Sequence, residues 1–165
     1  MPDTQEKLIA LLTQKQQLLE RVIPYLEEER GCILESNLER LAEVTEKTSA
    51  LLNELQELTR RCRGQVAQLA GELGMPEAKS LSPLVARLAE PQREALHGLQ
   101  AALMQMGERF DQLLRGNGDL LSGALGTVNR SLEFFGRLLN RNATYGGAGR
   151  IIDGAARSRI VCREI

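Results

Sequence analysis

The fold is decided by residues 38–73, which read LERLAEVTEKTSALLNELQELTRRCRGQVAQLAGEL. Apolar and small side chains recur there at alternating steps of three and four residues, which is a heptad seam on one face of an α-helix. The seam consists of Leu38, Leu41, Thr45, Thr48, Leu52, Leu55, Thr59, Cys62, Val66, Leu69 and Leu73. Leu51 and Leu58 widen the stripe enough to contact two neighbouring helices. Gly74 and Pro76 then form a stop signal, so the stretch predicts one long helix of a bundle.

The segment before this stretch predicts a second long helix, over residues 4–34. Aliphatic residues at three- and four-residue steps place one apolar face on it. These residues are Leu8, Leu11, Leu12, Leu18, Leu19, Val22, Ile23 and Leu26. Ser36 with Glu39 three positions later forms a capping box, and Asn37 is a competing N-cap. The next helix should therefore begin near residue 37.

The remainder of the chain predicts a short helix over 83–89, opened by Ser82 and Pro83, and a third long helix over 91–142. About 50 residues at 1.5 Å each make roughly 75 Å of helix. A helix of this length is longer than the diameter of a compact domain of 165 residues. We therefore expect an all-α fold: an elongated antiparallel bundle or hairpin of three long helices with a short connector helix. Residues 1–142 would form the bundle, and 143–165 a mobile C-terminal tail.

Glycines are unusually frequent in the third long helix, where each costs up to about 1 kcal/mol relative to Ala. They are Gly98, Gly107, Gly116, Gly118, Gly123, Gly126 and Gly136. One interpretation is that some of them admit a neighbouring helix closely while the rest face solvent. The other is that residues 116–126 are soft, so that the helix bends or exchanges partners when another helix binds.

Composition narrows the class of partner. Aromatic residues make up 3% of the 165 residues and hydrophobic residues 42%, so the apolar share is mostly aliphatic, as at helix interfaces. A net charge of −1 gives no field that would attract nucleic acid. The apolar stripes are wider than the chain's own packing needs, and the flexible side chains of Met104 and Met106 can adapt to a partner. These features instead suit helix-in-groove recognition of another protein.

Cysteine spacing and hydropathy indicate the compartment. Cys32, Cys62 and Cys162 are odd in number and lack the short spacings of metal sites, so they predict reduced thiols. The polar start has no apolar region behind it, and no apolar run reaches membrane-spanning length. We expect a cytoplasmic protein without membrane insertion, metal or cofactor.

Catalytic chemistry has no support in the sequence. His97 is the only histidine, which excludes motifs that need two, such as the di-iron Glu-x-x-His pair. It predicts an exposed helical residue. The glycines at 146–149 lack the Lys and the preceding strand of a phosphate-binding loop. We therefore expect no catalytic residue.

An ordered set of motifs resembles the FlgN family of flagellar export chaperones. It begins with Tyr-Leu-Glu-Glu-Glu-Arg at 25–30 and Leu-Glu-Ser-Asn-Leu-Glu-Arg-Leu at 34–41. It continues with Asn-Gly-Asp-Leu-Leu at 117–121 and Val-Asn-Arg-Ser-Leu-Glu-Phe-Phe at 128–135. Thr-Tyr-Gly-Gly-Ala-Gly-Arg at 144–150 completes the set. The likeness spans nearly the whole chain.

This resemblance implies a cytosolic chaperone that binds the C-terminal helical segments of hook–filament junction proteins, the hook-associated proteins. Such a chaperone keeps its clients unpolymerised and delivers them to the membrane export gate of the flagellar type III secretion system. Tyr145 would dock on the gate. The client would contact Leu120, Leu121, Leu125, Val128, Leu132, Phe135, Leu139, Ile151 and Ile152.

A different class of protein remains open on the same residues. A coiled-coil scaffold without a client would self-associate, for instance as a homodimer, through the seam of residues 38–73. Asn117 would then be a polar seam residue that specifies register. The two readings differ in whether an added client helix forms a one-to-one complex with the chain.

Overall fold

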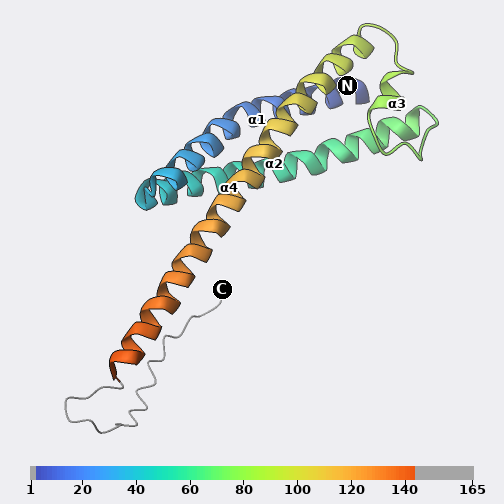
Figure 1. The fold of residues 1–165 in the computed structure, drawn as a ribbon. Coiled ribbons are helices and arrows are strands. Elements are labelled where there is room, and N and C mark those ends of the chain that lie inside the picture. The colour runs from blue at the N-terminus through green and yellow to red at the C-terminus, as the bar shows by residue number, and fades with distance from the viewer. Residues whose placement is uncertain (1–2, 144–165) are drawn as a thin grey trace, which may run out of the picture. The chain divides into compact units, whose positions relative to one another are not determined.

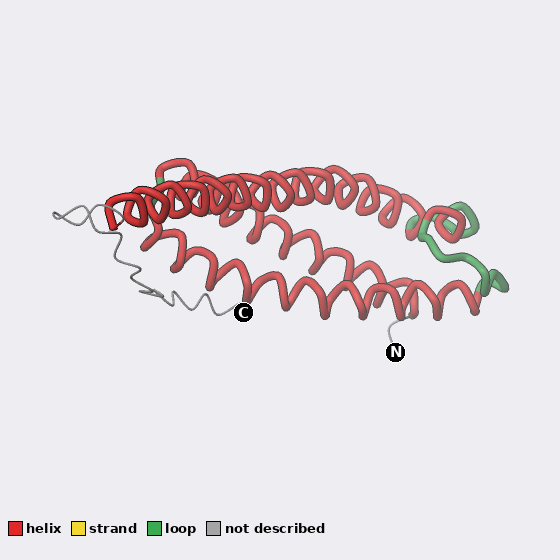
Figure 2. Tube along the Cα trace, turned by 60° about the horizontal axis from the view of Figure 1, so that its bottom comes forward, coloured by secondary structure: helices red, strands yellow, loops and turns green. Residues whose placement is uncertain are grey.

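The computed structural model describes residues 3–143, and every regular element in that range is an α-helix (Figures 1 and 2). The elements are α1 at Thr4–Glu35, α2 at Leu38–Glu72, α3 at Ser82–Val85 and α4 at Gln92–Ala143. The expected all-α class, with three long helices and a short one, is confirmed. The short helix ends at Val85, earlier than the expected residue 89, and the chain continues through Leu88 in single turns.

The chain divides into two units after Leu121. The first holds α1, α2, α3 and α4 up to residue 121. The described part of the second is the remainder of α4, and the two units are described separately. The division of the chain at residue 142 into a bundle and a tail stays a prediction.

The connection between α1 and α2 is two residues long, and its geometry corrects the predicted capping box. Ser36 has φ 56°, so it is the left-handed residue that ends α1. Its amide and that of Asn37 donate to the Ile33 and Cys32 carbonyls. Asn37 is the N-cap of α2, since its side chain accepts from the Arg40 amide at 3.2 Å. Ser36 cannot cap α2 because it already closes α1.

The other end of α2 is built as the sequence predicts. Gly74 has φ +66°, which suits glycine because it has no Cβ to clash with its own carbonyl. The Met75 amide donates to the Ala70 carbonyl at 2.8 Å, and the Gly74 amide to that of Gly71 at 3.2 Å. This pair of bonds is a Schellman cap, which satisfies carbonyls that the helix end leaves without partners.

The α1–α2 hairpin and the start of α4 enclose one aliphatic core. Its fully buried side chains include Leu8 and Val22 of α1, Leu69 of α2, Leu84 of α3 and Leu96 of α4. The buried face of α2 is set by Val44, Thr48, Leu51, Leu55, Leu58, Cys62, Leu69 and Ala70. The seam prediction is therefore wrong at the hairpin end, where Leu38 is 73% exposed and Val44 is buried.

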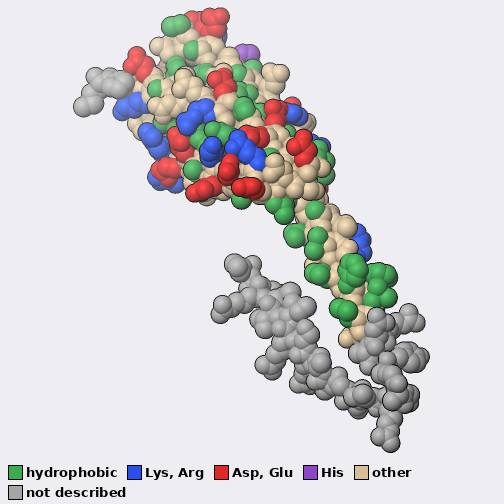
Figure 3. Space-filling model, turned by 90° about the vertical axis from the view of Figure 1, so that its left-hand side faces the viewer, with side chains coloured by type: hydrophobic (Ala, Val, Ile, Leu, Met, Phe, Trp, Pro, Cys, Tyr) green, Lys and Arg blue, Asp and Glu red, His purple; other side chains and the backbone are tan. Residues whose placement is uncertain are grey.

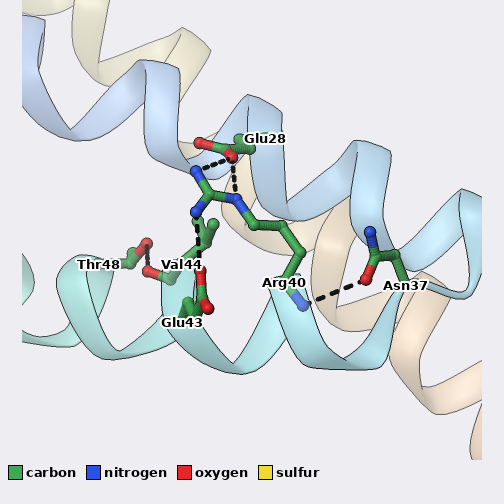
Figure 4. A network of polar contacts seen from close by, with 6 residues as sticks. All are labelled: Glu28, Asn37, Arg40, Glu43, Val44 and Thr48. Atoms are coloured by element: carbon green, nitrogen blue, oxygen red, sulfur yellow. Dashed lines mark hydrogen bonds and ion pairs between the residues drawn. The ribbon is translucent and has the colours of Figure 1, made fainter.

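Polar contacts fasten both ends of the hairpin. At one end the Thr4 hydroxyl donates to Glu72 at 2.6 Å. At the other, the Arg40 guanidinium joins Glu28 of α1 at 2.6 Å to Glu43 of its own helix at 2.8 Å (Figure 4). These hydrogen bonds, chiefly the one to Glu28, raise the pKa of Arg40 above its ordinary value. The two ion pairs of Arg40 are exposed, so they fix geometry more than they add stability.

Within the first unit, α4 is held against α1 by contacts around residue 27. Arg109 donates to Glu27 at 2.8 Å, and the Asn117 amide donates to the Leu26 carbonyl at 2.9 Å. Asn117 is 4% exposed, and its Oδ1 is buried without a hydrogen-bond partner among the described residues. A buried polar group of this kind costs free energy but restricts how the helices can align.

Candidate functional site

The described part of the second unit carries large apolar side chains in solvent. Leu125 is 64% exposed, Leu132 61% and Leu139 70%, and Val128 and Phe135 are each more than half exposed. These five residues are called the distal face. Hydrophobic side chains gather along this end of α4 (Figure 3). Exposed apolar groups that are contiguous rather than scattered mark interaction sites on soluble proteins.

The distal face is a single stripe along the helix. Its residues follow one another at steps of three, four, three and four, so they stack on one side at the angular spacing of an α-helix. The charged residues from 122 to 140 are Arg130, Glu133 and Arg137, whose positions fall on the opposite side. Glu133 and Arg137 approach to 3.9 Å, and both are largely exposed. The segment is therefore amphipathic, with its apolar side uncovered.

Two exposed apolar residues did not figure in the sequence prediction: Leu138 lies beside the distal face, and Phe134 lies farther round the helix. Phe134 is 59% exposed and Leu138 41%. The Phe134 and Phe135 rings meet edge to face, with centroids 5.8 Å apart and planes at 68°. A heptad pattern selects one residue of each adjacent pair, which is why it missed these two. The doublets Phe134–Phe135 and Leu138–Leu139 were the available signal.

The remaining predicted client residues fall elsewhere. Leu120 is half-buried and Leu121 is 41% exposed, and both belong to the end of the first unit. Tyr145, Ile151 and Ile152 lie outside the described residues. The structure thus places five of the predicted contacts together, as the distal face.

The glycines of α4 can be sorted by what a side chain would meet. A Cβ at Gly116 would lie 2.9 Å from Nη1 of Arg30, the far end of a flexible side chain that can move aside. At Gly118, Gly123 and Gly126 nothing lies within 4 Å of that position. No α4 glycine has the backbone of a neighbouring helix within 4 Å of the added Cβ. Both interpretations of these glycines, close approach and softness of residues 116–126, stay predictions.

The described residues offer no cluster for metal or redox chemistry. In residues 3–143, no group of three or more His, Cys, Asp or Glu side chains could hold a metal ion. His97 is exposed, as the sequence predicts. Cys32 and Cys62 are buried free thiols, and burial raises the pKa of Cys62, which keeps the thiol protonated and unreactive. Across the same range, no helix is long and apolar enough to cross a bilayer.

Comparison with known families decides the assignment. The family described as FlgN protein matches residues 1–151 of the chain. The chain belongs to the FlgN family. No curated protein and no solved structure matches it. FlgN proteins are cytoplasmic, non-enzymatic chaperones of flagellar export that bind hook-associated proteins. The amphipathic end of α4 is thus an exposed apolar surface on a protein whose family binds other proteins.

Proposed function

We propose that this FlgN chain binds the C-terminal helical segments of hook–filament junction proteins on the distal face, keeps them unpolymerised and delivers them to the flagellar export gate. One observation carries the proposal: five large apolar side chains form an uncovered seven-residue repeat on α4. An amphipathic helix is the partner that complements such a stripe, because its own apolar residues fill the spaces between those of α4.

Energetics favour a transient complex. A fully buried Leu or Phe side chain contributes about 1.5–3 kcal/mol relative to solvent, so the distal face holds ample binding free energy. Ordering the client segment and lost translational freedom offset much of it. Moderate affinity suits a chaperone, since the client must leave at the gate.

A one-to-one complex is the direct test. The full chain is mixed with the C-terminal helices of the junction proteins and followed by light scattering, and we expect a mass equal to the sum of one chain and one client. A chain that self-associates and ignores these helices would support the scaffold alternative instead. The seam residues Leu55, Cys62 and Leu69 are buried in the chain's own core, which argues against that scaffold, because it needs the seam for a second copy.

The C-terminal residues are proposed to contribute to client binding through Ile151 and Ile152. Deletion of residues 143–165 should leave the helical circular dichroism of the chain nearly unchanged while weakening client affinity several-fold. The first unit, with its core, is retained in this variant. Isothermal titration of the deletion and the full chain against the same client helix makes the comparison. An unaltered affinity would remove the tail from the client site.

Tyr145 is proposed to dock on the export gate rather than on the client. Tyr145→Ala should therefore preserve client affinity and lower the amount of junction protein that reaches the culture medium. Tyr145→Phe is the matched control, since it keeps the ring and removes only the hydroxyl. Normal secretion with the alanine variant would refute the docking role, and lost client affinity would reassign Tyr145 to the client site.

A further inference from the structure

The positions beside the distal face carry no charge. Leu125, Leu132 and Leu139 occupy one core position of its repeat, and Val128 and Phe135 occupy the other. The flanking positions hold Asn129 and Gly136 on one side and Ser131 and Leu138 on the other. Coiled coils usually place Glu and Lys at these positions, where they choose the partner helix and its orientation. A helix on the distal face would meet neutral flanks on both sides.

The first unit shows the contrasting arrangement on the same helix. There the repeat runs through Leu103, Met106 and Phe110, which pack against the core formed with α1 and α2. Its flanking position is Arg109, which donates to Glu27 of α1 at 2.8 Å. The helix therefore uses a flank charge where it pairs within its own chain, and the equivalent positions of the distal face lack one.

From residue 122 to residue 140, the charged residues lie away from these flanks. Arg130 and Arg137 share the repeat position opposite the core positions, and the Glu133 side chain is 69% exposed. At this distance from a bound helix, and in solvent, their influence is reduced by screening. The distal face and its flanking positions therefore consist of apolar side chains and small neutral ones.

We propose that the distal face accepts amphipathic helices with large aliphatic residues in a seven-residue repeat, whichever sign of charge flanks that repeat. The inference rests on the proposed function. A helix is the expected occupant of the distal face, because the apolar repeat of the same α4 is already covered by helices in the first unit. Discrimination between partners usually needs repulsive or unpaired charges, and the distal face offers none.

Two synthetic helical peptides test the inference with the full chain. Both carry Leu at every core position, and one has Glu and the other Lys at every flank. The dissociation constants, measured by fluorescence anisotropy at about 0.15 M salt, should differ less than about threefold. Both should change little in higher salt, because the contacts are apolar.

A matched pair of variants locates the effect. The double substitution Asn129→Glu with Ser131→Glu adds two negative charges at the flanks, and it should favour the Lys-flanked peptide by about tenfold. Arg130→Glu changes the net charge by the same amount on the opposite side of α4. This control should leave the two peptides within about threefold of one another. Circular dichroism verifies that both variants keep their helices.

Each contrary outcome has a distinct meaning. A wild-type preference above about threefold for either peptide would overturn the inference. If junction-protein helices bind and neither peptide does, the inference fails while the proposed function stands. If none of these helices binds, both fail. A stable dimer of the chain that Leu132→Asp dissociates would make a second copy the occupant, which also overturns the inference.

Discussion

Leu132→Asp is expected to weaken client binding by about 100-fold or more. Leu132 lies in the middle of the distal face and is 61% exposed in the free chain. A client helix would bury it at the centre of the interface, where truncation of a single anchor typically costs about 2–4 kcal/mol. An unpaired carboxylate placed there adds a desolvation penalty. Titration of the variant with a client helix measures the loss.

The control for this variant is Gly123→Asp. It adds the same single charge to the same helix, at a position on the opposite side where an added Cβ has nothing within 4 Å. Gly→Asp also improves helix propensity, so the fold is not weakened. Client affinity should stay within about threefold of the unmodified chain. Equal losses in both variants would mean that binding depends on overall charge and not on the distal face.

The helical architecture was predictable because two kinds of sequence signal agree, the apolar period of a helix and the residues that cap its ends. The apolar period of Leu8 to Leu26 and of residues 38–73 specifies an amphipathic helix, and the caps specify its ends. Gly74 illustrates this, since a glycine directly after a heptad seam predicts a left-handed residue that ends the helix, and Gly74 is that residue. Local chemistry and long-range packing agree at these positions, so the sequence alone suffices.

The predictions failed where two local rules compete for one residue. Ser36 satisfies the capping-box pattern with Glu39, yet the short connection requires a left-handed residue to end α1, and Ser36 takes that role. Leu38 follows the seam, but it begins α2 beside the connection, beyond the reach of the core, and stays exposed. Neither outcome follows from periodicity, because both depend on how α1 meets α2.

The candidate site shows a related limit. Periodicity finds the distal face, but it does not distinguish an apolar stripe that is covered from one that is not. Leu96 and Leu132 belong to one helix and one pattern, yet Leu96 is 0% exposed and Leu132 61%. The difference comes from where α1 and α2 contact α4, which is a property of the tertiary structure. Sequence therefore predicts the apolar side of α4, and the structure identifies which part of it is exposed.

This difference makes Leu96→Ala and Leu132→Ala opposite in effect. Leu96→Ala removes a fully buried side chain from the core, where deletion leaves a cavity and lowers the free energy of unfolding by about 2–5 kcal/mol. Leu132→Ala removes an exposed side chain, and the free energy of unfolding should change by less than about 0.5 kcal/mol. Urea unfolding followed by circular dichroism measures both.

Client binding should follow the reverse order. The folded fraction of Leu96→Ala keeps the distal face intact, so its affinity for a client helix at low temperature should equal that of the unmodified chain. Leu132→Ala should bind more weakly by about 30-fold, because one anchor of the interface, worth about 2 kcal/mol, is lost. If Leu96→Ala lost affinity while folded, the buried and open parts of α4 would act as one cooperative surface. If Leu132→Ala lost stability instead, that residue would be covered within the chain, and the distal face would not be available to a client.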